Sequence, residues 1–338
     1  MKIRDHSLSV EPVDGSDLTF VVQGPIFTEA NPNFGVTTKT ALDSLRKYFP
    51  GSPIILSTYT DSDLNGLSYD QLVETNEAQE PYQVAKLLGT EVENSINRQI
   101  CTSRKGLELV KTPLACKTRS DNVFTSNRLL QLRRSYEKQD RDFSFFKERL
   151  LIPNYMSRNP RHIVPLAYHF SDTLVFGLAE DVLSFFDLPY TKEPEHTCYF
   201  DIHQMPEDAW DPCAMRRFHS EQYFLHCIIQ RHMEPEFEHQ LDIRPELFDR
   251  VDRILVNNFV IHDLDSIGLK FVLPLSLGDR ISMYHHRDWE LLYGKWLDQE
   301  FPCRPYSPLY RLYHSVLCKL LNWRFLYRRK DEIALPYI

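Results

Sequence analysis

Apolar segments of strand length alternate with helix-like segments over the first 130 residues, and this alternation is the strongest constraint on the fold. Strands are predicted at 18–24, 53–59, 71–75 and 113–117. Between them, apolar side chains recur at near-helical spacing over 36–49 and 94–110. Strands that are apolar throughout and separated by helices are typical of a mostly parallel sheet covered on both faces. We therefore predict an α/β fold of the Rossmann type.

The second half of the chain is less regular. Apolar content and spacing predict further helices at 127–138 and 219–230, and further strands at 149–153, 168–177 and 253–263. The Pro-rich segment 188–216 is predicted to be a long loop, and loops of this length are often lids or binding loops.

Polar side chains follow three of the predicted strands where each strand ends. In parallel sheets, ligands bind at the carboxyl ends of the strands. The segments that should meet there are 23–24, 58–63 and 117–121. Three separate parts of the chain thus indicate one binding edge.

The stretch "KTRSD" is the most unusual of these segments. Side chains alternate along a strand, so Lys117, Arg119 and Asp121 should share one face near its end. Cationic side chains suit phosphate oxygens, and a carboxylate suits a divalent cation that bridges phosphates. A plain ion pair at the strand edge is an equally good interpretation of the same residues.

Composition and missing motifs exclude several classes of function. The net charge is −8, which gives the chain no overall reason to bind nucleic acid. The sequence contains neither a G-x-G-x-x-G fingerprint nor a P-loop, which argues against dinucleotide oxidoreductases and Walker-type NTPases. The N-terminus has no apolar segment of signal-peptide length, and no run approaches the roughly 18 apolar residues of a membrane span. We expect a cytoplasmic protein that rests on a membrane.

Six short motifs in a fixed order resemble one known family. They are "VVQGPI", "PIILSTY", "NRQICTSRKGLELV", "KTRSD", "DTLVFG" and "SEQYF". Together they resemble the WavE lipopolysaccharide-synthesis family of bacterial surface-glycan assembly, over about two thirds of the chain. That family is similar to GT-A-type glycosyltransferases, which have a single Rossmann-like domain that binds a nucleotide sugar.

The resemblance implies a role for each strand end. Gln23, Gly24 and Pro25 would line the nucleotide-base pocket, and Thr58 and Asp61 would lie near the base or ribose. The phosphates and the donor sugar would be contacted by Asn97, Arg98, Lys117, Arg119 and Asp121.

The resemblance implies a divalent cation as cofactor, but this chain departs from the motif that would hold it. GT-A enzymes hold Mg²⁺ or Mn²⁺ with an Asp-x-Asp motif at this strand end, where this chain has Arg119 and then Asp121. Arg119 could supply part of the positive charge itself, so metal independence is also plausible. His262, after an apolar run, is a weaker candidate ligand.

Two carboxylates outside the donor half are candidates for the acceptor site. An inverting transferase needs a base to deprotonate the acceptor hydroxyl. We prefer Glu221 as this base and Asp172 as a contact to the acceptor or donor sugar. The alternatives are a helix-terminal acid for Glu221, favoured by the helix dipole, and a half-buried turn residue for Asp172.

The C-terminal segment is basic in an otherwise acidic chain. Residues 310–330 interleave apolar and aromatic side chains with Arg and Lys, a pattern that suits an anionic membrane surface. We expect one GT-A-like domain at 1–300, with a nucleotide-sugar half at 18–135 and an acceptor half at 136–300, followed by a helical tail at 301–338. The predicted function is sugar transfer from a nucleotide sugar to a lipopolysaccharide or capsule glycan. A sugar nucleotidyltransferase or a non-catalytic glycan-binding protein is the alternative.

Overall fold

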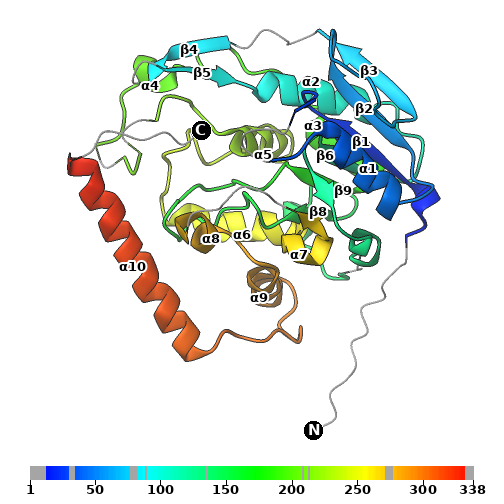
Figure 1. Ribbon diagram of the computed structural model, residues 1–338. Helices are drawn as coiled ribbons and strands as arrows, with labels where there is room; N and C mark the ends of the chain where they lie inside the picture. Colours follow the sequence, from blue (N-terminus) through cyan, green and yellow to red (C-terminus); the bar gives the residue numbers. More distant parts are fainter. Residues whose placement is uncertain are drawn as a thin grey trace.

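The computed structural model describes residues 13–29, 35–76, 82–87, 90–133, 136–207, 209–211, 214–270 and 277–331. Within these ranges the central element is a seven-stranded sheet in the order β10-β8-β9-β6-β1-β2-β3 (Figure 1). Its strands are β1 (Leu18–Gln23), β2 (Ile54–Tyr59), β3 (Gln71–Thr75), β6 (Leu114–Arg119), β8 (Leu150–Pro153), β9 (Leu174–Leu178) and β10 (Phe259–His262). The predicted α/β fold with a mostly parallel sheet is confirmed.

Strand direction determines where a site can form. β1 pairs in parallel with β2 and with β6, β2 pairs in parallel with β3, and β10 pairs in parallel with β8. β9 is antiparallel to both β6 and β8. The carboxyl ends of the parallel strands and the amino end of β9 therefore lie along one edge of the sheet.

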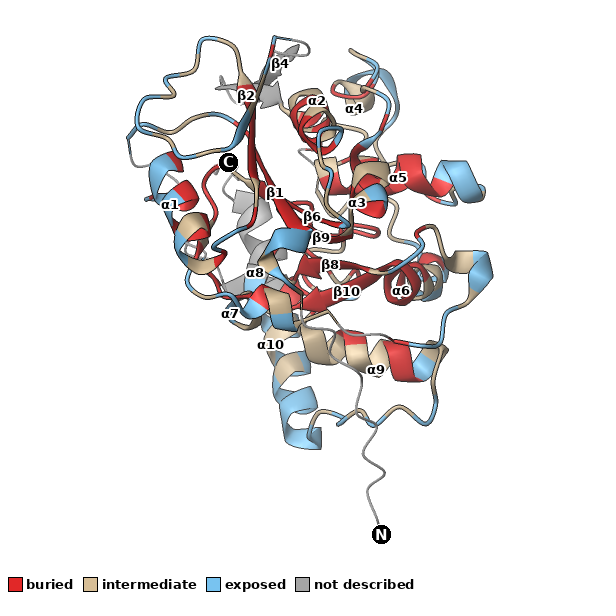
Figure 2. Cartoon of the chain, turned by 90° about the vertical axis from the view of Figure 1, so that its right-hand side faces the viewer, coloured by how far each residue is buried: buried red, intermediate tan, exposed pale blue. Residues whose placement is uncertain are grey.

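Apolar side chains fill both faces of the sheet, as the unbroken apolar strands predict. On one face, Val21 and Ile55 pack with helices α2 (Ile96–Leu107), α3 (Ala179–Phe186), α5 (Ser220–His232) and α6 (Glu246–Asn258). On the other, Phe20 and Leu56 pack with α1 (Thr38–Tyr48). Figure 2 shows the buried strands enclosed between these helices. Each fully buried large apolar side chain stabilises the fold by about 1.5–3 kcal/mol, and this packing holds the strand ends in place.

Gly106 explains how α2 lies so close to the sheet. A Cβ at this position would be 2.5 Å from Val21 Cγ1 and 3.0 Å from Ser57 Cβ. Glycine lowers helix propensity, but here the missing side chain allows the helix to contact β1 and β2 directly. The helix predicted at 94–110 is confirmed without a break at the glycine.

Two predicted elements are wrong, and a third is shorter than predicted, since the strand expected at 168–177 begins only at Leu174. Of the helix expected at 127–138, the described residues form only the 3₁₀ turn η2 (Arg128–Gln131). The strand expected at 253–263 is mostly the C-terminal part of α6, and β10 begins only at Phe259. Asn258 marks the change, because its side-chain amide donates to Ile254 O one turn back and its Oδ1 accepts from Phe145 N.

Shorter elements complete the description. They are η1 (Gly15–Asp17), β4 (Tyr82–Leu87), β5 (Thr90–Asn94), β7 (Val123–Phe124), η3 (Arg141–Phe143), α4 (Tyr199–Ile202), α7 (Leu264–Ile267), β11 (Leu269–Lys270), α8 (Leu277–Ser282), α9 (His286–Trp296) and α10 (Pro308–Asp331). α4 lies inside the predicted 188–216 loop. Helix α10 runs along the outside of the helical layers (Figure 1), where His314 packs against His162 with 4.8 Å between ring centroids.

Candidate functional site

The tips of β1 and β6 are joined by hydrogen bonds. Ser120 N donates to Gln23 O at 2.9 Å, and Ser120 Oγ donates to Pro25 O at 2.6 Å. Gly24 has φ +128°, a conformation that L side chains rarely adopt, and its N–H donates to Ser57 O at 3.1 Å. The predicted meeting of strand ends 23–24 and 117–121 is therefore observed, with glycine required at the turn.

Arg119 and Asp121 form a bidentate ion pair at the end of β6. Arg119 Nε donates to Asp121 Oδ1 at 2.8 Å, and Arg119 Nη2 donates to Asp121 Oδ2 at 2.7 Å. The Asp121 side chain is 1% exposed, whereas that of Arg119 is 37% exposed. The pair therefore presents a guanidinium to solvent and keeps the carboxylate beneath it.

This arrangement does not fit a divalent cation. Both oxygens of Asp121 already accept from a cationic group, and a metal ion would have to displace that guanidinium. His262 lies on β10, three strand positions from β6, or about 14 Å at the usual spacing. Its ring stacks on His286 at 4.2 Å between centroids. Among the described residues, no three His, Cys, Asp or Glu side chains are grouped as metal ligands would be.

Lys117 lies beneath the site rather than on its surface. Its side chain is 1% exposed, and Nζ donates to Asp172 O at 2.7 Å and lies 3.8 Å from Asp172 Oδ2. Nζ also lies 4.7 Å from the Phe186 ring centroid. Burial lowers the pKa of Lys117 to about 8, although the nearby Asp172 acts in the opposite direction. Lys117 thus fixes the start of β9 against β6 and is not presented to a ligand.

Glu221 and Asp172 are both buried next to this charged cluster. Glu221 is the second residue of α5, whose first turn is fixed because Gln222 Nε2 donates to Ala167 O at 2.8 Å. Glu221 Oε2 accepts from Ser220 Oγ at 2.8 Å and lies 3.4 Å from His169 Nε2. Burial raises the pKa of both carboxyl groups.

The charged side chains act on one another electrostatically. Lys117 is affected by Asp172, Arg119, Glu221 and Asp121. The structure therefore brings the predicted acceptor carboxylates and the "KTRSD" residues into one cluster at the carboxyl edge of the sheet. Charges gathered in this way at a strand edge are typical of functional sites.

The residues predicted to contact the base, ribose and phosphates lie along the same edge. Thr58 is buried, and Asp61 is exposed in a left-handed conformation with φ 67°. The guanidinium of Arg98, in the first turn of α2, lies 6.0 Å from the ring centroid of Tyr59 at the end of β2. Asn97 Oδ1 accepts from the backbone N–H and the hydroxyl of Thr191, so it anchors the loop after α3.

Sequence reasoning missed Arg158. It is 6% exposed, its backbone N–H donates to His169 O at 2.8 Å, and the charge of its side chain acts on His169, His219 and Glu221. Its position shortly after β8 was a usable signal, because the other site residues also follow strands. The backbone nearby is unusual, since Met156 and Tyr168 both have positive φ, 64° and 56°. Such conformations are costly and occur often at functional sites.

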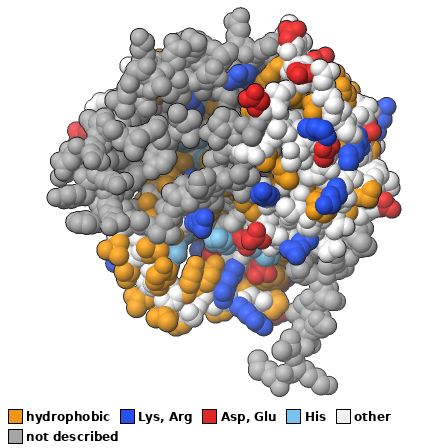
Figure 3. Space-filling view, in the orientation of Figure 1, with side chains coloured by type: hydrophobic (Ala, Val, Ile, Leu, Met, Phe, Trp, Pro, Cys, Tyr) orange, Lys and Arg blue, Asp and Glu red, His pale blue; other side chains and the backbone are white. Residues whose placement is uncertain are grey.

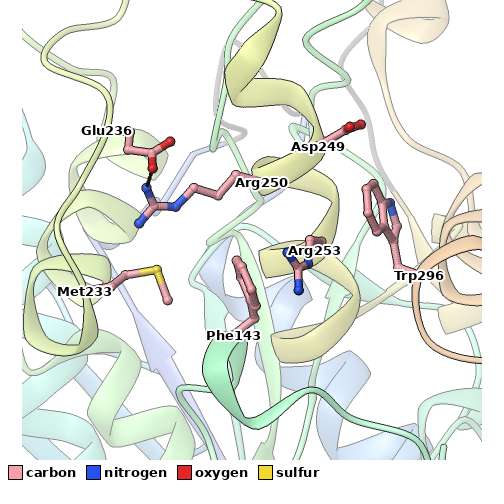
Figure 4. A pocket seen from close by; sticks show the side chains of 7 residues that line it. All are labelled: Phe143, Met233, Glu236, Asp249, Arg250, Arg253 and Trp296. Atoms are coloured by element: carbon pink, nitrogen blue, oxygen red, sulfur yellow. Dashed lines mark ion pairs between the residues drawn. The ribbon is translucent and has the colours of Figure 1, made fainter.

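A surface groove of about 420 Å³ lies elsewhere, among α6, α9 and the segment after α5. Figure 4 shows Arg250 directed at Glu236, and Arg253 beside Phe143 and Trp296. None of the predicted site residues lines this groove. Its charged side chains pair with each other or with Asp140 and Lys295, which indicates a structural role.

The fold and the charged strand edge define an α/β protein with a candidate polar site at the carboxyl ends of parallel strands. The chain belongs to the WavE lipopolysaccharide synthesis family, whose model matches residues 18–324. No curated protein matches the chain. A solved structure, residues 1–349 of TarS from S. aureus, aligns with 82% of this chain and 72% of its own length, at 11% identity and a TM-score of 0.29.

Proposed function

We propose that this protein is a glycosyltransferase that moves a sugar from a nucleotide-sugar donor to a bacterial surface glycan, lipopolysaccharide or capsule. Family membership supports a role in lipopolysaccharide synthesis. The observation that carries the transferase assignment is the joined tips of β1 and β6, where the Arg119 guanidinium, about one-third exposed, acts on the buried carboxyl groups of Asp172 and Glu221.

Sugar transfer needs both a cationic group and a carboxyl group. The acceptor oxygen bonds to the anomeric carbon while the bond from that carbon to the diphosphate breaks, and the bonding electrons leave with the nucleotide. Arg119 opposes the charge that develops on the diphosphate. Glu221 receives the proton of the acceptor hydroxyl. Asp172 contacts a sugar hydroxyl, and Gln23, Gly24, Pro25, Thr58 and Asp61 hold the base and ribose.

The diphosphate site works without a divalent cation in this proposal. The Arg119 guanidinium supplies a positive charge where a metal would otherwise bind, and it already occupies both oxygens of Asp121. Arg98 at the start of α2 adds a second cation near the end of β2.

A panel of nucleotide sugars tests this function by thermal stabilisation, titration calorimetry and product analysis. One donor should bind, and Glu221→Gln should reduce turnover by about 10²-fold or more while leaving donor affinity unchanged. Glu180→Gln is a matched control, because Glu180 is also the second residue of a helix but is exposed. A sugar nucleotidyltransferase would instead release diphosphate from a nucleoside triphosphate. A non-catalytic glycan-binding protein would bind no donor.

We also propose that α10 docks the protein on the anionic inner face of the cytoplasmic membrane, where a lipid-linked acceptor would lie. No described helix is both long enough and apolar enough to cross a bilayer. The α10 residues Leu309, Leu312, Tyr313, Val316 and Leu320 are between 46% and 77% exposed. Figure 3 shows a dense group of hydrophobic side chains at the corner of the molecule where α10 lies.

Charge complementarity favours a membrane as the occupant of this surface. Residues 301–330 contain seven Arg and Lys and no Asp or Glu, although the whole chain has a net charge of −8. An exposed apolar helix within a basic segment binds anionic lipid through both burial and electrostatic attraction.

A further inference from the structure

The tautomer of His169 is fixed by a backbone carbonyl. His169 Nδ1 lies 2.7 Å from Met156 O, and a carbonyl oxygen can only accept, so Nδ1 carries the proton. In the neutral ring, Nε2 then has a free lone pair. The left-handed backbone at Met156 and at Tyr168 is part of the turn geometry that sets this contact.

That lone pair faces the carboxyl group of Glu221. Nε2 lies 3.4 Å from Glu221 Oε2, and both side chains are almost fully buried, at 1% and 7% exposure. Oε2 is also the atom that accepts from Ser220 Oγ. Two lone-pair atoms facing each other in a buried setting repel unless one proton lies between them.

The surroundings of this pair determine where the proton rests. The titratable and charged groups that act on it come from several elements: Arg158 after β8, Asp172 before β9, His219 at the start of α5, and Lys117 and Arg119 on β6. Ser220 acts on Glu221 through a hydrogen bond. Burial lowers the pKa of His169 to about 3 and raises the pKa of Glu221. The proton therefore rests on Glu221, which donates to Nε2.

We propose that His169 and Glu221 form a single proton-transfer unit in which His169 Nε2 is the final proton acceptor. This step rests on the proposed transferase function. As the acceptor hydroxyl gives its proton to one oxygen of Glu221, the proton on Oε2 moves to Nε2. Glu221 ends as a neutral acid again, His169 becomes an imidazolium, and the departing diphosphate supplies the compensating negative charge. His169 is thus a positioning residue that acts through Glu221.

Two substitutions of His169 distinguish a role in proton transfer from a purely structural role. His169→Asn keeps a donor for Met156 O but places nothing opposite Glu221. His169→Gln keeps an amide opposite Glu221, but an amide does not take up the proton. His226→Gln is the control, because His226 is a buried histidine that packs against Phe218 and Phe237 instead.

Both His169 variants should lose on the order of 10²-fold in kcat, with donor Kd unchanged, while His226→Gln keeps its turnover. The pH profile of kcat/KM gives a second readout. The wild-type acid limb follows protonation of His169, whereas in His169→Gln it follows Glu221 alone. Since Glu221 has the higher pKa of the two, the limb should move to higher pH in His169→Gln.

A kcat for His169→Gln close to that of the wild type, with an unmoved acid limb, would overturn the proposal. The proposed transferase function would be contradicted by a different result, namely that the wild-type protein binds no nucleotide-sugar donor. ¹⁵N-histidine NMR needs no donor, and it should show an unprotonated Nε2 on His169 whose shift changes in Glu221→Gln. A protonated Nε2 in the resting protein would also contradict the inference.

Discussion

Removing the guanidinium of Arg119 is the sharpest perturbation of the proposed donor site. In Arg119→Ala the buried Asp121 carboxylate loses two charge-assisted hydrogen bonds, of 2.8 and 2.7 Å. Breaking a buried ion pair costs about 3–5 kcal/mol, and exposed pairs contribute about 0–1 kcal/mol. Because Arg119 is about one-third exposed and Asp121 is buried, we expect a loss of about 2–3 kcal/mol.

The assay is a pair of thermal scans with a double-mutant cycle. The midpoint of Arg119→Ala should fall by about 3–4 °C. Arg119→Ala/Asp121→Asn should recover part of this loss, since a neutral amide leaves no uncompensated buried charge. Turnover should fall by about 10²-fold in both variants, because the positive charge opposite the diphosphate is gone.

Metal chelation tests whether the Arg119 guanidinium takes the place of a divalent cation. Wild-type turnover should survive EDTA, because Arg119 already occupies both oxygens of Asp121. Mn²⁺ should stabilise Arg119→Ala but not the double variant, since only the former keeps the Asp121 carboxylate after the guanidinium is removed. If EDTA abolishes wild-type turnover and Mn²⁺ restores it, the guanidinium does not replace a cation.

Three further predictions test other parts of the structure. Gly106→Ala should destabilise the fold by about 1–2 kcal/mol, because the new methyl overlaps Val21, and Val21→Ala should partly compensate; a stabilised Gly106→Ala would refute the close packing of α2. Between pH 8 and 10.5, Lys117 is protonated in the unfolded chain but largely neutral in the folded one, so the free energy of unfolding should rise with pH. If the free energy of unfolding of Lys117→Met rises with pH at the same slope, the pKa of Lys117 is not lowered in the folded protein. Deleting residues 308–338 should abolish binding to anionic vesicles at an unchanged thermal midpoint; retained binding would assign the exposed apolar face of α10 to another partner.

Local patterns predicted the elements that matter most for the site. The strands around Val21, Ile55 and Ala115 were recognisable because both faces of a parallel sheet are buried, which leaves uninterrupted apolar runs. The segment before Phe259 was predicted incorrectly, since a buried helix and a buried strand both read as apolar runs when they are short.

The sequence also predicted that the candidate residues gather at one edge of the sheet, as they do in the structure. Gln23 and Arg119 end strands β1 and β6, Asp121 lies just beyond β6, and parallel pairing brings these strand ends together. Their roles toward a donor remain predictions. Alternation along β6 correctly put Lys117 and Arg119 on one face, yet it could not show that the Lys117 ammonium is buried against Asp172.

The sequence by itself thus determined the sheet, the edge at which the candidate site residues gather and the chemical types of group available there, because those depend on periodicity and local spacing. Only the tertiary structure decided how the groups pair: Arg119 with Asp121, Lys117 with Asp172, and His169 with Glu221. Pairing between distant segments depends on strand order and on burial. Burial in turn sets which group keeps its proton, and no local pattern in the sequence records it.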